Sequence, residues 1–108
     1  MSRTTPYYAV IFTSTLTDND NGYSEMAEQM ENLASKQPGF LGFESARGEV
    51  GISVSYWKTL KAIADWKAQA DHQFAQEKGI TDWYEWYKIR ICRVEREYDF
   101  FRGTSSNT

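Results

Sequence analysis

The sequence predicts an α+β domain in which two helices cover one face of an antiparallel sheet. Two segments with apolar residues at helical spacing, 24–34 and 60–78, stand between stretches rich in β-branched and aromatic residues. The resulting order is β-α-β-β-α-β, with a short hairpin between the two central strands. This is the order of the ferredoxin-like arrangement. At 108 residues the chain is expected to form one domain with an ordered core over about 7–101.

The first half of the chain predicts a strand, a helix and a second strand. The first strand is expected over Tyr7–Thr13, where β-branched and aromatic residues are frequent. A turn follows at 18–22, and Ser24 is expected to cap the first helix. The Pro38–Gly39 pair ends that helix. The second strand is then expected over Phe40–Ser45.

The second half begins with a hairpin and a long helix. Residues 47–51 connect the second strand to a third, Ile52–Trp57, in which apolar and polar residues alternate. Thr59 is a candidate N-cap for a helix that runs from 60 towards 78. Gly79 either ends that helix or breaks it.

The last elements are less regular in sequence. Residues 80–86 are ambiguous, with a short helical turn capped by Thr81 as one interpretation. The final strand is expected from Tyr87 towards Tyr98, and its mixed pattern indicates either a bulge near Cys92–Arg93 or burial on both faces. The tail 102–108 is expected to be disordered.

Composition excludes several classes of function. The net charge is −3, and basic residues are interleaved with acidic ones, so no basic stripe is available for nucleic acid. No apolar run approaches the roughly 20 residues that a membrane-spanning helix needs, and the N-terminus lacks the apolar core of a signal peptide. With one histidine and one cysteine, a protein-only zinc site is not expected, and no motif indicates a cofactor. A cytoplasmic protein is the default expectation.

Both faces of the predicted strands carry apolar residues. In the first strand one face presents Tyr8, Val10 and Phe12, and the other presents Tyr7, Ala9 and Ile11. An exposed sheet face would instead be polar at every second position. Because two helices can cover only one face, we expect the second face to pack against the sheet of an identical subunit, which predicts a homodimer.

Aromatic residues make up 16% of the chain, so some are expected to line a pocket or an interface. The candidates for contact with a small-molecule ligand are Tyr56, Trp57, Trp83 and Arg90. Each has a structural alternative. Tyr56 and Trp57 point to opposite faces of their strand and are equally suited to core or dimer packing. Trp83 suits a dimer contact, and Arg90 suits an ion pair with a glutamate.

Two residues of the second helix are candidates for catalysis. His72 is the candidate base, because an unperturbed histidine pKa near 6.5 suits proton abstraction at neutral pH. On a helical wheel His72 lies about 140° from the centre of the apolar arc. A surface or capping histidine is therefore the alternative. Trp66 lies about 100° from the same centre, where it either walls a pocket or seals the helix against the sheet.

Several blocks of the chain resemble the antibiotic biosynthesis monooxygenase domain family, also described as dimeric α+β barrels. The resemblance is carried by the first strand at 7–12, the Pro-Gly-Phe turn and second strand at 37–44, the Tyr-Trp to Trp spacing within 54–66, and His72 followed by Ala75 and Gly79. It covers residues 7 to about 100. It implies a ferredoxin-like subunit that dimerises through its sheet and holds a pocket between sheet and helices.

The resemblance also implies a reaction. Some members oxidise polycyclic aromatic compounds with O₂ and no metal or flavin, so we expect a cofactor-independent monooxygenase in which a carbanion reacts with O₂ inside a dry aromatic pocket. The alternative is a non-catalytic, ligand-binding or stress-related homodimer. Haem-degrading members use an asparagine on the first strand, a tryptophan on the second helix and a histidine near its end. This chain matches only the tryptophan, at Trp66, so haem binding is the weakest of the three expectations.

Overall fold

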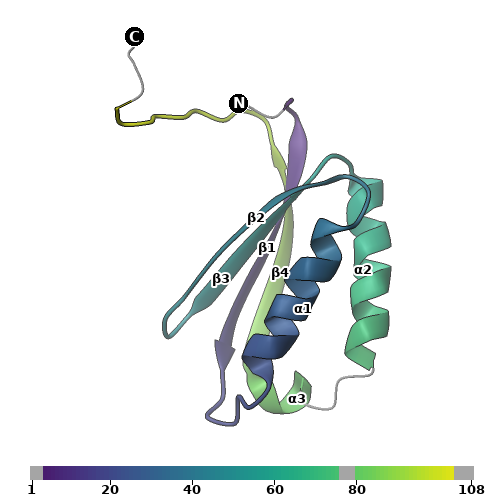
Figure 1. Cartoon of the computed structure of the whole chain (residues 1–108), viewed down its shortest axis with the longest axis vertical. Coiled ribbons are helices and arrows are strands. Elements are labelled where there is room, and N and C mark those ends of the chain that lie inside the picture. Colours follow the sequence, from purple (N-terminus) through teal and green to yellow (C-terminus); the bar gives the residue numbers. More distant parts are fainter. Residues whose placement is uncertain (1–3, 76–79, 104–108) are drawn as a thin grey trace.

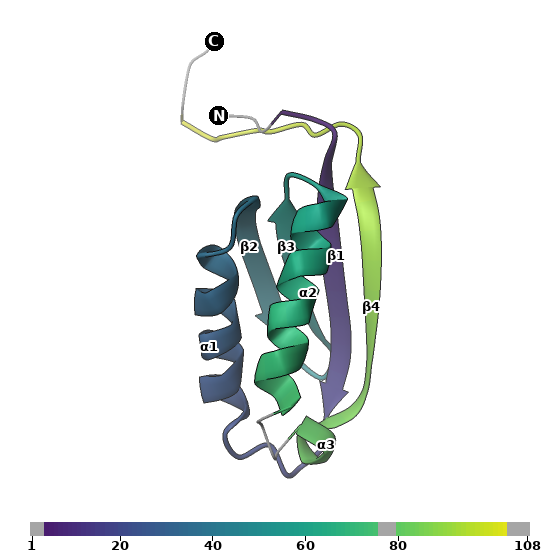
Figure 2. The ribbon, with the colours of Figure 1, turned by 90° about the vertical axis from the view of Figure 1, so that its right-hand side faces the viewer.

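The four strands form one antiparallel sheet, and the two long helices pack on the same face of it (Figures 1 and 2). The computed structural model of the protein describes residues 4–75 and 80–103. Its elements are β1 (Tyr7–Leu16), α1 (Tyr23–Ser35), β2 (Phe40–Arg47), β3 (Gly51–Trp57), α2 (Leu60–Ala75), α3 (Ile80–Trp83) and β4 (Tyr84–Val94). The strand order is β2-β3-β1-β4. This confirms the predicted α+β, ferredoxin-like class.

The two long helices begin in different ways. α2 has the predicted cap, since the backbone N–H of Ala62 donates to Thr59 Oγ1 at 3.0 Å. α1 has no side-chain cap, and its N-cap residue is Gly22 at a φ of 86°. The prediction of a Ser24 cap is wrong, because the chain enters α1 through a left-handed glycine and Ser24 already lies inside the helix.

The core lies between the sheet and α2 and is built around Trp57. This side chain is 0% exposed, and its Nε1–H donates to Ser55 Oγ at 2.8 Å. Its ring stacks on Trp66 of α2 at 6.0 Å between centroids and meets Phe40 edge-on at 5.4 Å. Tyr56 and Trp57 point to opposite faces, as predicted. The structure shows that Trp57 faces the helices and Tyr56 faces the other side of the sheet.

β4 keeps a regular alternation over most of its length. Val10, which packs on the core, is opposite Ile91, and Phe12 is opposite Ile89, so both isoleucines face the side of the helices. Cys92 is opposite Ala9 and points to the other side. Of the two predicted explanations for the mixed pattern, the bulge near Cys92–Arg93 is therefore wrong. The mixed pattern arises because both faces of this strand carry apolar residues.

The irregularity of β4 lies at its opposite end. Thr15 pairs with Trp86 but Leu16 pairs with Tyr84, so Glu85 is an extra residue in the ladder. β4 starts directly after the helical turn α3, which confirms a short helix in 80–86. Thr81 lies inside α3 rather than at its cap. The predictions for Gly79 and for the tail 104–108 lie outside the described residues.

The sheet face that points away from the helices is called the far face. Its side chains include Ile11, Ile52, Val54, Tyr56, Trp86, Lys88, Arg90 and Cys92. Ile52 and Trp86 are about half exposed. Within the described part of the chain, no helix has the length and apolar character needed to cross a membrane.

Candidate functional site

Four polar side chains from four different elements meet on the helix-facing side of the sheet, where β1 ends. They are Ser14 of β1, Tyr23 of α1, Arg47 of β2 and Tyr84 of β4, and we call them the polar cluster. An Nη2–H of Arg47 donates to Ser14 Oγ at 2.5 Å and lies 3.4 Å from the Tyr23 hydroxyl. The Arg47 guanidinium also lies 5.3 Å from the centre of the Tyr23 ring, and the rings of Tyr23 and Tyr84 meet edge-on at 5.6 Å. The cluster thus joins one cation to three hydroxyl groups.

Arg47 reaches Ser14 by crossing a glycine. Arg47, Gly51 and Ser14 are opposite one another on three adjacent strands, so they form one row across the sheet. A Cβ at position 51 would lie 2.0 Å from Arg47 Cζ. Only glycine leaves the guanidinium room to pass over β3, and the contact buries Ser14 to 1% exposure.

The bulge at Glu85 brings Tyr84 into the cluster. In a regular strand Tyr84 and Tyr87 would point to opposite faces, but the extra residue turns both towards the helices. With Phe12 they form a triangle of rings, with centroid distances of 5.6 Å, 5.2 Å and 5.4 Å. This triangle connects the polar cluster to the rest of β4.

The electrostatics of the cluster favour a neutral phenol at Tyr84. Burial raises the pKa of Tyr84 far above the ordinary value of 10.0, and the neighbouring Tyr23 phenol raises it further by its charge and its hydrogen bond. Arg47 opposes this shift without reversing it. Like any phenol, Tyr84 is protonated at neutral pH, and the raised pKa extends its role as a hydrogen-bond donor to more alkaline conditions, in the same cluster as a permanent cation.

An apolar strip extends along β4 from the cluster. Tyr87, Ile89 and Ile91 face the side of the helices but are 52%, 49% and 52% exposed. The reason is visible in Figure 2, where α1 and α2 lie over β2, β3 and β1 and leave β4 at the uncovered edge. An aromatic ring can pack on such an apolar surface. An anionic oxygen at one end of the ring can then accept hydrogen bonds from the polar cluster.

The cluster is not suited to a metal ion. The permanent positive charge of Arg47 repels a cation, and the four residues of the cluster include no carboxylate, imidazole or thiolate. Over residues 4–75 and 80–103, no group of three His, Cys, Asp or Glu side chains stands close enough to hold a metal.

Three of the sequence-predicted residues lie on the helix-facing side. Trp57 and Trp66 stack on each other in the core, some distance along the sheet from the polar cluster, and Trp66 is half-buried at the core's edge as the wheel predicted. Trp83 lies beside the cluster. Its Nε1–H donates to the backbone oxygen of Asn21 at 2.7 Å, and its ring meets Tyr23 at 6.1 Å.

The other predicted residues lie elsewhere. Tyr56 is on the far face, where its hydroxyl donates to Glu44 Oε1 at 2.7 Å. Arg90 is exposed on the same face. His72 is exposed in the last turn of α2. The sheet therefore separates Tyr56 and Arg90 from Trp57 and Trp66.

The sequence did not predict a site role for Ser14, Tyr23, Arg47 or Tyr84. Two signals were present. Gly51 stands four residues after Arg47 across a hairpin, and Tyr84 and Tyr87 are spaced by three in a segment that is otherwise strand-like.

Comparison with known proteins gives a consistent result. The family model described as "Antibiotic biosynthesis monooxygenase" matches residues 6–78. The protein named "Uncharacterized protein YqjZ" of Bacillus subtilis (strain 168) is 50% identical over 102 residues, which cover 93% of this chain and 90% of that protein. The "Jasmonate monooxygenase ABM" of Pyricularia oryzae is 37% identical over 43 residues, 40% of this chain and only 20% of that longer protein.

A solved structure has the same fold at low sequence identity. The crystal structure of a variant of SnoaB, a cofactor-independent oxygenase from Streptomyces nogalater, superposes with a TM-score of 0.69 at 12% identity. The match covers 84% of this chain and 95% of that one.

Proposed function

The chain belongs to the antibiotic biosynthesis monooxygenase family, and we propose that it is a monooxygenase that oxidises a small aromatic compound with O₂ and no cofactor. The observation that carries the proposal is the polar cluster at the end of the apolar strip, where Arg47 contacts Ser14 and Tyr23 and the Tyr84 ring lies against Tyr23. The names of two similar proteins, an oxygenase described as cofactor-independent and a monooxygenase, support the same type of reaction.

The proposed reaction draws all its electrons from the substrate. A base removes a proton from an acidic C–H of the aromatic compound. The negative charge delocalises onto a carbonyl oxygen that is attached to the ring. Arg47 and Tyr84 stabilise that oxygen. The carbanion forms a C–O bond with O₂, and the resulting hydroperoxide loses water to leave a carbonyl. The net reaction converts the CH₂ group and O₂ into a C=O group and H₂O. The CH₂ carbon gives up four electrons, which reduce one oxygen atom to the carbonyl oxygen and the other to water.

The remaining roles follow from position. His72 is our candidate for the base, and Trp66 for a wall of the site, as the sequence suggested. Trp83 supports Tyr23 from outside the cluster. Trp57 is fully buried, so its role is to hold the β3–α2 core. Tyr56 and Arg90 lie on the far face and are better placed for a subunit interface than for the ligand.

Gly51→Ala is expected to reduce turnover by about 10²-fold, the usual effect of losing one donor to a developing oxyanion. The new Cβ displaces the flexible end of Arg47 and leaves the backbone unstrained. Tyr84→Phe, which removes only a hydroxyl, is expected to have a similar effect. The measurement is O₂ consumption with an anthrone, whose methylene hydrogens are acidic, after subtraction of the rate without protein.

Gly48→Ala is the matched control, because it lies in the same hairpin and a Cβ there meets nothing within 4 Å. It is expected to retain full activity. If Gly51→Ala and Tyr84→Phe both stay within twofold of the unmodified protein, the polar cluster is not the site. His72→Ala belongs in the same series. Unchanged activity at every pH from 5 to 8 would remove His72 as the base.

A ligand-binding role without turnover is the second candidate. The observation that favours it is that the polar cluster supplies donors and a cation but no evident proton acceptor. Calorimetric titration with an anthrone under nitrogen separates the two functions. Binding that Tyr84→Phe weakens, together with no O₂ consumption in air, would support the binding role.

We also propose that two copies pair through their far faces. The half-exposed Ile52 and Trp86 supply apolar surface. Lys88 and Arg90 of β4 lie at one edge of this face and Glu44 of β2 at the other. A two-fold axis parallel to the strands would place β4 of each subunit over β2 of the other, so that opposite charges meet. Light scattering is expected to give twice the chain mass of 12.5 kDa.

A further inference from the structure

We propose that the C-terminal arm, residues 95–103, crosses onto a second copy of the chain and packs its aromatic side chains there. The inference rests on the proposed homodimer and adds a second contact to it. Three features of the arm support the exchange: its aromatic exposure, its direction and its charge.

The first feature is an unusual run of exposed rings. Tyr98, Phe100 and Phe101 are 84%, 78% and 63% exposed, and they are the three most exposed large apolar side chains of the described residues. The ring of Phe100 contacts the arm's own Arg102, whose guanidinium lies 5.8 Å from its centroid. Three large rings within four residues would bury several hundred Å² on a second surface, and single subunits rarely leave such a patch in water.

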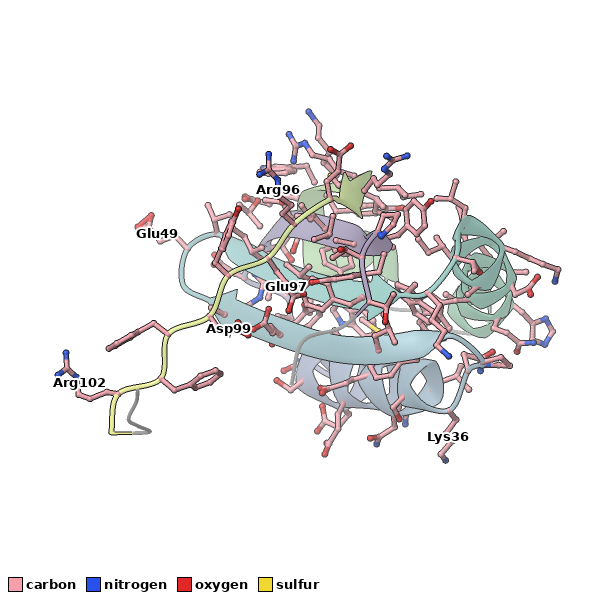
Figure 3. All side chains as sticks on the ribbon, turned by 90° about the horizontal axis from the view of Figure 1, so that it is seen from above. Lys36, Glu49, Arg96, Glu97, Asp99 and Arg102 are labelled. Atoms are coloured by element: carbon pink, nitrogen blue, oxygen red, sulfur yellow. The ribbon has the colours of Figure 1, made fainter. Side chains whose placement is uncertain are left out.

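The second feature is the direction of the arm. After Val94 the chain leaves the sheet in an extended form, and the Tyr7 hydroxyl donates to Glu97 Oε1, which fixes the start of the arm beside β1. The arm then projects away from the body on the side opposite the helices (Figure 1). Figure 3, seen from above, shows Glu97, Asp99 and Arg102 along this path. The rings are therefore carried to the side on which the far face lies.

The third feature is charge. The first half of the arm carries Glu95, Glu97 and Asp99 against a single Arg96. Glu95 forms an ion pair with Arg93 of the same chain at 3.4 Å, and Asp99 carries negative charge farther out along the arm. The far face of β4 carries the exposed cations Lys88 and Arg90. A second copy seated on the far face presents these cations to the incoming arm, and two-fold symmetry makes the exchange reciprocal. The second copy is thus a partner with complementary charge and apolar surface on the side that the arm reaches.

The test is a dilution series followed by sedimentation velocity. The triple variant Tyr98→Ser, Phe100→Ser and Phe101→Ser is expected to raise the dimer dissociation constant at least about tenfold, which corresponds to the loss of a small part of the buried apolar area. These side chains are exposed in the subunit, so its fold and its far-UV circular dichroism are expected to stay unchanged. Leu60→Ser, which removes an exposed side chain at the start of α2, is the control and is expected to leave the constant unchanged.

A crosslinking experiment locates the arm directly. The photoreactive residue p-benzoylphenylalanine replaces Phe100 in a mixture of ¹⁴N and ¹⁵N copies, and crosslinked peptides that combine both isotopes show exchange. Crosslinks confined to one isotope would overturn the arm exchange. An unchanged dissociation constant in the triple variant would also overturn it and leave the far-face dimer standing. A monomeric unmodified protein would instead overturn the dimer itself, and the exchange with it.

Discussion

Trp57→Ala is expected to lower the free energy of unfolding by about 3–5 kcal/mol, the range found when a fully buried large aromatic is truncated. The side chain is 0% exposed and contacts Phe40 on one side and Trp66 on another. The variant therefore leaves a cavity that two rings line. It also leaves the Ser55 hydroxyl, itself buried, without the indole donor.

The measurement is urea denaturation followed by far-UV circular dichroism, at one fixed protein concentration because association would stabilise the folded state. Trp57→Phe is the graded comparison. It keeps a ring in the cavity but loses the hydrogen bond to Ser55, so about 1–2 kcal/mol is expected. A loss below 1 kcal/mol for Trp57→Ala would show that the core is not organised around this residue.

Gly39→Ala is expected to lower the free energy of unfolding by about 2–5 kcal/mol, from two separate causes. Gly39 has a φ of 86°, a conformation that costs an L-residue about 1–2 kcal/mol. The new Cβ would also lie 2.7 Å from the Cβ of Ala62 on α2, and relieving such a contact costs about 1–3 kcal/mol. Here β2 starts so close to α2 that the backbone oxygen of Gly39 accepts the N–H of Lys58 at 2.8 Å.

Two variants separate these causes in the same denaturation experiment. Gly22→Ala carries the same φ of 86°, but its Cβ would lie 3.5 Å from the Trp83 ring, an ordinary contact. The free energy of unfolding of Gly22→Ala is therefore expected to fall only by the cost of the positive φ, about 1–2 kcal/mol. Adding Ala62→Gly to Gly39→Ala removes the clash and is expected to recover part of the loss, minus about 0.5–1 kcal/mol for a glycine in a helix. If Gly39→Ala and Gly22→Ala lower the free energy of unfolding equally, the contact between Cβ of residue 39 and Ala62 of α2 does not destabilise the protein.

The fold was predictable because local patterns carry it. The alternation of apolar and polar residues in 52–57 predicted that Tyr56 and Trp57 face opposite sides of the sheet. The helical spacing of apolar residues predicted that Trp66 lies at the edge of the core, where the structure places it. The Thr59 cap follows from the preference of a hydroxyl for the open N–H groups of a first helical turn. Each of these inferences needs only residues that are close in sequence.

The polar cluster was not predictable in the same way. Ser14 and Arg47 each lie just beyond the predicted ends of their strands, because polar residues at a strand end read as turn residues. Their partnership exists only in the folded sheet, where β1 and β2 are both neighbours of β3 and Gly51 leaves a gap between them. Tyr84 joins them through a bulge whose position depends on pairing with β1. The residues of such a site can be predicted only when the register of three strands is known.

The uncovered edge of the sheet has a consequence for how such a domain can diversify. The buried hydrophobic core lies between the sheet and the helices α1 and α2, whereas Ile89 and Ile91 are half exposed on the edge strand β4. Exchanging these two side chains would alter the shape of the proposed ligand surface while removing few buried contacts, so it would cost little folding free energy. Substitutions at Ile89 and Ile91 can therefore change which ligand fits the proposed surface without destabilising the fold.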